Sequence, residues 1–241
     1  MNGTLALAMA EIRRLRRNRR YLILTIGFPV LLYLIVGKSN TTAYGVAFKS
    51  FYMVSMATFG ALSGAFNNNT IRISQERKEG WIRQLRLTPL PANAYVGAKL
   101  IASMVTSLPA IVIVFLLGHF YGGVDMVAWK WLVIGVAIWF GTFIFAALAV
   151  AIGYRVSPDS VQPVAMIIFF IFSLLGGLWF PVNGGLADVA KLTPTYQVVK
   201  IDTDVLGTGN FDVANVIGIV VWLAIFLGLA IFAVRSTAET M

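Results

Sequence analysis

The sequence has no cysteine, a single histidine and few charged residues. Only 12% of its 241 residues are charged, whereas soluble domains carry about 25%. Without cysteine the chain can form no disulfide, thiolate metal site, iron–sulfur cluster or cysteine nucleophile, and His119 alone offers little for a metal site. Hydrophobic residues reach 59%, more than a soluble domain of this length could cover with polar groups. The composition therefore predicts a protein whose solvent is lipid.

Six uncharged apolar runs are long enough to cross the hydrocarbon core of a membrane, which takes about 17–25 helical residues. Barrel strands would be about ten residues long with alternating polarity, so these continuous runs indicate helices. The sequence predicts an all-α polytopic membrane protein with a single transmembrane domain over residues 1–241. The expected spans are residues 21–37, 50–71, 100–121, 131–154, 161–180 and 213–234.

The basic residues predict the orientation of these spans. Of the 19 Lys and Arg residues, 14 fall before the first span, between spans two and three, or at Arg155 and Arg235. Because basic residues accumulate on the cytoplasmic side, both termini are expected to be cytoplasmic. Residues 1–20 combine arginines with apolar positions, which predicts an amphipathic helix at the membrane interface. It is either an anchor only or also a contact for a partner.

Residues 72–93 form a long, charged connector on the expected cytoplasmic side. Gly80 interrupts it before a short amphipathic stretch, residues 81–87, and Pro89 ends that stretch. Three apolar side chains can share one side there: Trp81, Ile82 and Leu85. The pattern predicts a short helix that another protein holds, and an interfacial helix beneath its own spans is the alternative.

Residues 181–212, on the opposite side, also form an unusual connector. Pro181 continues an apolar span, and a short amphipathic pattern around Leu186 lies between two glycines and Pro194. Such a segment can dip back into the membrane or cover its outer surface. The sequence predicts a re-entrant segment between spans five and six.

Several functional motifs are missing. The predicted spans contain no Asp, Glu, Lys or Arg, which argues against an ion-coupled carrier or a channel working alone, because such groups are retained where they function. An enzyme embedded in the membrane would also need a catalytic constellation that the spans do not offer. Gly37, Lys38 and Ser39 resemble the end of a phosphate-binding loop, but its first glycine would fall at Leu32. A powered transporter would therefore need its motor on another chain.

The order of the spans and two loop motifs are characteristic of a known family. The first cytoplasmic loop reads Glu76-Arg-Lys-Glu-Gly80, then Leu85 and Thr88-Pro89. The outer segment reads Phe180-Pro181 and then Leu192-Thr-Pro194-Thr-Tyr196. With the six spans and the basic N-terminal helix, these motifs resemble the membrane subunit of type-2 ABC exporters. The resemblance covers nearly the whole chain and fits bacterial drug-export permeases better than polysaccharide permeases.

The resemblance implies a non-catalytic permease in the cytoplasmic (inner) membrane of a bacterium. It implies pairing with a second copy or a homologous permease, and with two ATP-binding subunits that hold ATP and Mg²⁺. No cofactor is expected in this chain, and nucleic acid is not an expected partner. A coupling helix would contact the ATPase through Glu76, Arg77, Glu79, Gly80, Trp81, Leu85, Arg86 and Pro89. A second contact with the ATPase or with membrane lipid would involve Arg13, Arg16, Arg17 and Arg20.

The resemblance also implies a substrate path beside spans two and five. Its expected lining is Phe51, Tyr52, Met56, Phe59, Asn67, Met166, Phe169, Phe170 and Trp179. Because no basic residue lies within a span, we expect a neutral or cationic amphipathic drug, hydrophobic peptide or lipid that enters near residues 67–69. A polysaccharide or lipid-linked glycan is the alternative. Small residues at helical spacing predict close helix packing at Gly60, Gly64 and Gly177.

Overall fold

The computed structural model describes residues 3–17, 19–37, 39, 41–87, 92–182 and 184–239. These residues are almost entirely helical, with one two-stranded antiparallel hairpin. The predicted all-α class is confirmed. The elements are α1 (Gly3–Arg17), α2 (Arg19–Val36), β1 (Thr42–Ala43), β2 (Val46–Ala47), α3 (Phe48–Lys78), α4 (Trp81–Arg86), α5 (Ala92–Phe120), α6 (Ala128–Arg155), α7 (Val161–Leu175), α8 (Leu186–Lys191), α9 (Pro194–Gly207) and α10 (Val213–Glu239).

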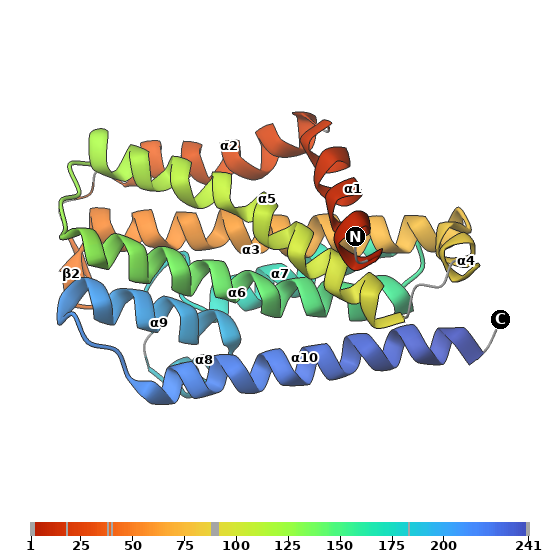
Figure 1. Cartoon of the computed structure of the whole chain (residues 1–241). Helices are drawn as coiled ribbons and strands as arrows, with labels where there is room; N and C mark the ends of the chain where they lie inside the picture. Colours follow the sequence, from red (N-terminus) through yellow and green to blue (C-terminus); the bar gives the residue numbers. More distant parts are fainter. Residues whose placement is uncertain are drawn as a thin grey trace.

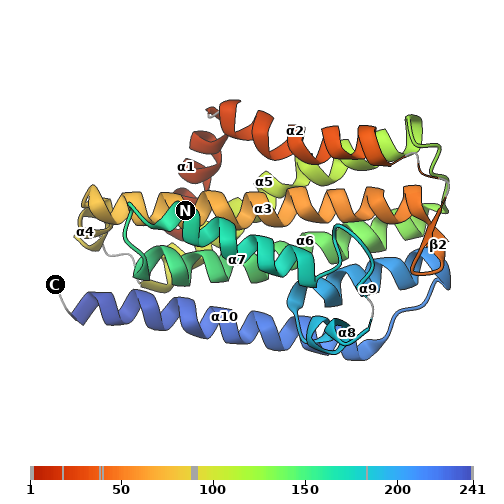
Figure 2. The ribbon, with the colours of Figure 1, turned by 180° about the vertical axis from the view of Figure 1, so that it is seen from behind.

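The long helices run side by side in one bundle, and α3 lies at its centre. Helix α3 packs against α2, α5, α6, α7 and α9, and most of its residues are buried. Figure 1 and Figure 2 show α4 and the C-terminus at one end of the bundle and the β hairpin at the other. Helix α1 crosses the bundle obliquely near the α4 end. The two ends differ in character, with charged residues concentrated at the α4 end.

Within the described residues, three helical segments are long and apolar enough to cross a membrane: Ala94–Phe120, Ala128–Arg155 and Val213–Ser236. Two further apolar segments, Thr25–Val36 and Val161–Leu175, are shorter. Helix α3 is 31 residues long, but amides, hydroxyls and charges lower its hydropathy. The chain is therefore a membrane protein with three clear spans, and the six-span topology stays a prediction at α2, α3 and α7.

Several helices extend beyond the predicted spans. Helix α3 continues past residue 71 to Lys78, and α5 begins at Ala92. A charged residue ends a hydrophobic span but not a helix, because Glu, Arg and Lys are good helix formers. Helix α7 instead stops at Leu175, short of the predicted end at residue 180. Gly177 follows with φ of 73°, which turns the backbone out of the helix.

The three predicted packing glycines have different surroundings. A Cβ at Gly60 would lie 3.1 Å from Pro29 Cγ and 3.3 Å from Ala110 Cβ, so α3 lies close to both α2 and α5 there. Gly64 is buried on the same helix. Gly177 lies in the turn after α7, where a Cβ would lie 2.7 Å from Tyr44 Oη. Gly177 therefore serves a turn rather than the contact between two helices.

A close approach between α6 and α3 gives a test of this packing. A Cβ at Gly153 would lie 2.8 Å from Ile73 Cβ and 2.9 Å from the Thr70 carbonyl oxygen, whereas at Gly228 on α10 it would meet nothing within 4 Å. We expect Gly153→Ala to lower the midpoint of thermal unfolding in detergent. Gly228→Ala is the matched control and should leave the midpoint unchanged or raise it, because alanine favours a helix by roughly 0.5–1 kcal/mol over glycine. Equal midpoints for the two variants would contradict the packing.

Candidate functional site

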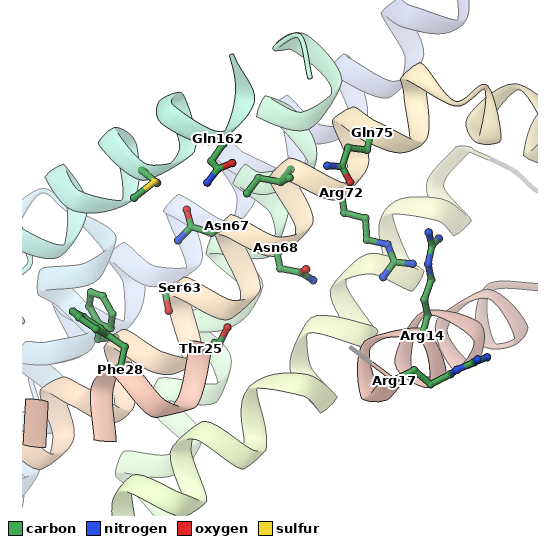
Figure 3. Close-up of a pocket in the computed structure, with 13 residues that line it drawn as sticks. Arg14, Arg17, Thr25, Phe28, Ser63, Asn67, Asn68, Arg72, Gln75 and Gln162 are labelled. Atoms are coloured by element: carbon green, nitrogen blue, oxygen red, sulfur yellow. The ribbon is translucent and has the colours of Figure 1, made fainter. Parts of the chain in front are cut away.

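A large cavity lies between α1, α2, α3 and α7. Its volume is about 940 Å³, which matches the ~300–1,000 Å³ of ligand pockets in proteins. Figure 3 shows residues from these four helices around it. The lining consists of Arg14, Arg17, Thr25, Phe28, Phe59, Ser63, Asn67, Asn68, Ile71, Arg72, Gln75, Gln162 and Met166.

The cavity is apolar at one end and cationic at the other. Phe28 packs against Phe59 with ring centroids 5.6 Å apart, and Figure 3 shows Phe28 at the end opposite Arg14 and Arg17. Asn67 and Asn68 lie between these two ends. A cavity with this distribution of polarity suits an amphipathic ligand.

Three of the nine predicted path residues line this cavity: Phe59, Asn67 and Met166. Trp179 borders it, since its ring packs edge-on against Phe59 at 5.4 Å. The structure places the others elsewhere in this chain. Phe51, Tyr52 and Met56 are buried in the hydrophobic core, Phe169 is buried in the second apolar cluster, and Phe170 is exposed on α7.

The three adjacent asparagines separate into two groups. Asn67 and Asn68 line the cavity, whereas Asn69 is buried and donates to Ser103 Oγ on α5 and to the Ala65 carbonyl. A helix turns by about 100° per residue, so three consecutive side chains cannot all face one cavity. Two of the three residues at the predicted entrance therefore line the cavity, and the entrance itself stays a prediction.

A buried cluster of charges joins α1, α3 and α5 beside the cavity. Lys99 Nζ lies 2.9 Å from Glu11 Oε1 and 3.0 Å from the Glu76 carboxylate. Arg72 lies 2.8 Å from Glu11 Oε2 and 2.9 Å from Glu76 Oε1. Tyr95 Oη also donates to Glu76 Oε2, at 2.8 Å. Glu11, Glu76 and Lys99 are each at most 4% exposed, so this is an ionic contact shielded from water.

The cluster keeps Glu76 ionised although the residue is buried. Burial raises the pKa of Glu76, but the charge and hydrogen bond of Lys99, the Tyr95 hydroxyl and the charge of Arg72 outweigh it, so its pKa is lowered. A carboxyl with a lowered folded-state pKa stabilises the fold above its ordinary pKa, and that contribution is lost as pH falls. The pairing therefore holds near neutral pH and weakens in acid.

Sequence analysis did not identify this cluster. In the sequence, Lys99 is only one of the basic residues between spans two and three, and Glu76 is only a candidate for contact with the ATPase. A usable signal is present, because Glu11 is the one acidic residue in a strongly basic N-terminal segment and Lys99 lies at the edge of an apolar run. Isolated charges at such places usually have a partner.

Breaking the cluster should cost much more stability than breaking an exposed pair. Lys99→Met leaves two buried carboxylates with one cation, so we expect a loss of about 3–5 kcal/mol in the free energy of unfolding. Lys78→Met is the control, because Lys78 pairs at 3.6 Å with Asp159 and both side chains are exposed. Denaturant or thermal unfolding in detergent measures both variants. A Lys99→Met variant as stable as Lys78→Met would refute the cluster.

Helix α4 is attached to the bundle by one side. Ile82 is buried in an apolar cluster with Ile73 and Tyr95, whereas Trp81 is 39% exposed. The turn before α4 contains the exposed Glu79 and then Gly80, whose φ is 73°. Ile82 faces the bundle, and Trp81 stays open to solvent or to a partner.

The remaining predicted coupling residues have mixed positions. Arg77 donates to the Gly153 carbonyl at 3.1 Å, so it also contributes to the contact between α3 and α6. The backbone of Leu85 and Arg86 belongs to α4, but their side chains lie outside the described part of the structure. Pro89 lies outside the described residues altogether.

Among the predicted N-terminal arginines, Arg13 and Arg17 are exposed on α1, and Arg17 lines the cavity. The side chains of Arg16 and Arg20 lie outside the described part of the structure. Arg14, which the sequence analysis did not select, lines the cavity and lies 3.8 Å from Glu76 Oε1. Helix α1 therefore contributes directly to the rim of the cavity.

The predicted outer segment, residues 181–212, contains α8 and α9. Thr193 caps α9 by accepting from the Tyr196 N–H, and Pro194 occupies its first turn. Helix α9 packs against α6, α10 and α3, and Trp222 of α10 donates to the Leu192 carbonyl at 2.7 Å. The segment therefore packs on the bundle, and its entry into the membrane stays a prediction.

Asp202 on α9 is fully buried, and its carboxylate has no hydrogen-bond partner among the described residues. Burial raises the pKa of Asp202 well above its usual range. Sequence analysis could not reveal this burial, because Asp202 lies outside the predicted spans. It is an acidic group inside the bundle, where the folded chain favours its neutral form.

The burial of Asp202 predicts a pH dependence opposite to that of Glu76. The unfolded chain releases this proton near the ordinary Asp pKa of about 3.9, whereas the folded chain retains it. Stability from this group is therefore lost as pH rises. We expect Asp202→Asn to raise the unfolding midpoint more at about pH 8 than at about pH 5. Thermal unfolding at both pH values checks it, and an equal effect at both would contradict the burial.

Comparison with known proteins identifies the family of this chain. Residues 37–234 match the family described as ABC-2 family transporter protein. The chain therefore belongs to the ABC-2 family and is the membrane permease component of an ABC transporter, a class that works with ATP-binding subunits.

The chain is also similar over its length to a curated bacterial protein. It is 25% identical over 241 residues to a protein of Bacillus subtilis (strain 168) named "Putative transport permease YvfS". The alignment covers 98% of this chain and 98% of that protein. The resemblance of this chain to type-2 ABC permeases is confirmed by the family match over residues 37–234.

Proposed function

We propose that this chain is the membrane subunit of an ATP-driven exporter that moves an amphipathic small molecule, peptide or lipid out of the cytoplasm or the inner leaflet. Family membership supports a transport role. The observation that carries the proposal is the cavity of about 940 Å³ between α1, α2, α3 and α7, which joins an apolar end to a polar one. The ligand would enter beside Asn67 and Asn68.

The working assembly would contain two permeases and two ATP-binding subunits. The permeases would be two copies of this chain or this chain with a homologue, and ATP and Mg²⁺ would be held by the partner subunits. The complex would lie in the cytoplasmic membrane of a bacterium, with both termini and α4 inside. The distribution of Lys and Arg supports this orientation.

The contacts of α4 supply a route for coupling. An ATP-binding subunit would hold the exposed side of α4 at Trp81, while Ile82 joins the apolar cluster that contains Ile73 of α3 and Tyr95 of α5. Tyr95 donates to Glu76, whose charge cluster holds α1. A displacement of α4 would thereby move α1, which forms the rim of the cavity.

The two sides of α4 should respond differently to substitution. Trp81→Asp should leave the unfolding midpoint unchanged but reduce transport-coupled ATP hydrolysis several-fold, because it places a charge on the side offered to the ATPase. Ile82→Asp should lower the midpoint, because it buries a charge in the apolar cluster. The measurements are thermal unfolding of the permease and substrate-stimulated ATPase activity of the complex. Wild-type coupling in Trp81→Asp would rule out the docking role.

Export of a polysaccharide or a lipid-linked glycan is the second candidate. Four amide side chains line the cavity, on Asn67, Asn68, Gln75 and Gln162, and amides can donate to and accept from sugar hydroxyls. Analysis of a deletion strain separates the candidates. Loss of surface glycan with unchanged tolerance to amphipathic compounds would favour this second candidate.

A further inference from the structure

Among the described residues that line the cavity there are cations but no acidic residue. Its arginines are Arg14, Arg17 and Arg72, and the other described lining residues are amide, hydroxyl or apolar. One of these arginines, Arg72, pairs with two carboxylates of the charge cluster, namely Glu11 and Glu76. Whether the cavity has a net charge therefore depends on how those carboxylates are already paired.

Within the cluster, two carboxylates are matched by two cations. Arg72 lies within 2.9 Å of both Glu11 and Glu76, and Lys99 lies within 3.0 Å of both. These four charges sum to zero and are nearly buried. Arg72 is thus neutralised by the protein, although its side chain lines the cavity.

Arg14 and Arg17 are the lining cations that remain after the two cluster carboxylates have been matched by Arg72 and Lys99. Arg14 is 61% exposed and reaches the already paired Glu76 only at 3.8 Å. Arg17 is exposed, and no ion pair joins it to any other described residue. The two arginines are three residues apart on α1, a spacing that places them on the same side of the helix. Figure 3 shows both at the same end of the cavity.

The opposite end suits a hydrocarbon chain. Phe28 and Phe59 pack together there, and Phe59 is itself held by Trp179 and Phe169 through edge-on ring contacts. Met166 also lines the cavity. Met166 is a flexible apolar side chain that adapts to irregular ligands. A single ligand can therefore contact the arginines and the aromatic end at once if it is an amphiphile.

We propose that the transported amphiphile is an anion, with a phosphate or carboxylate held by Arg14 and Arg17 and a hydrocarbon chain lying along Phe28, Phe59 and Met166. This inference rests on the proposed function and names the substrate class of the same cavity. Arginine matches the planar or tetrahedral oxygens of such groups with paired N–H donors. A cation placed there would meet two guanidinium groups and no free carboxylate among the described lining residues.

The inference differs from the expectation drawn from the spans. A search for basic residues within the apolar runs finds none, which favours a neutral or cationic substrate. The arginines in question lie on α1, before the first span, and α1 folds back so that they reach the cavity. The charge of the site therefore comes from a segment that hydropathy assigns to the membrane surface.

The natural absence of cysteine allows a direct binding test. The full-length permease carrying Asn68→Cys is placed in phosphatidylcholine nanodiscs and labelled with a water-soluble maleimide. Dodecyl phosphate should protect this cysteine, whereas Gln84→Cys on the exposed part of α4 should label at the same rate with or without it. Protection at both positions would mean a general surface effect and would overturn the site.

Charge variants then identify the groups that bind. In the Asn68→Cys background, Arg14→Gln with Arg17→Gln should raise the half-protecting concentration by about tenfold or more, since two charge-assisted contacts are lost. The matched control, Lys78→Gln with Arg235→Gln, removes two exposed cations outside the cavity lining and should change it little. Equal effects of the two pairs would overturn the proposal.

Ligand variants test the class. Dodecyltrimethylammonium that protects as well as dodecyl phosphate would overturn an anionic substrate, and inorganic phosphate that protects as well would overturn an amphiphile. Phosphatidylglycerol added to the nanodisc distinguishes the source: competition supports an anionic membrane lipid, and its absence supports an anionic amphiphile from the cytoplasm. Binding needs no ATPase, so failure of ATP-driven export with intact binding would refute the exporter role and not the charge of the ligand.

Discussion

The position of α1 depends on the buried ion pairs of Glu11 and Glu76 with Lys99 and Arg72. Apolar packing secures the central helices, because α3 and α6 bury long runs of side chains against each other. Helix α1 instead brings Glu11 into a site where two cations from other helices already face Glu76. Opposite charges shielded from water hold a specific geometry, because any displacement would leave a buried charge unpaired. One cluster of ion pairs therefore links α1 at the rim of the cavity, the first turns of α5 and the C-terminal end of α3.

This arrangement connects two regions that have different tasks. The apolar anchor of α4 and the hydroxyl of Tyr95 belong to the same small neighbourhood as Glu76. The arginines of α1 lie on the other side of that neighbourhood and reach the cavity. A force applied at α4 and a ligand bound in the cavity would both act on the same charges. The proposed coupling therefore needs only contacts that lie next to one another in the fold.

The sequence was sufficient for the class of protein, because uninterrupted apolar runs leave no other way to satisfy the backbone in lipid. The loop motif from Glu76 to Gly80 and the outer motif at Pro194 also pointed to the family, which the match over residues 37–234 confirms. Hydropathy could not locate the ends of α3 and α5. A charged residue marks where a helix leaves the hydrocarbon core, but the helical backbone continues past it. Glu11 and Lys99 are 88 residues apart in the sequence, so only the packed structure reveals that they pair. The same holds for the burial of Asp202 and for the reach of Arg14 into the cavity.

The continuity of α3 has a mechanical consequence. The helix runs for 31 residues with no proline, a length of roughly 45 Å at 1.5 Å per residue. Its neighbours α2 and α5 contain Pro29 and Pro109 within their helices, and proline removes a backbone hydrogen bond and favours bending. Helix α3 thus behaves as a stiff rod between two helices that can flex. A displacement of its α4 end would therefore be carried along α3 toward the hairpin, and bending would be concentrated in α2 and α5.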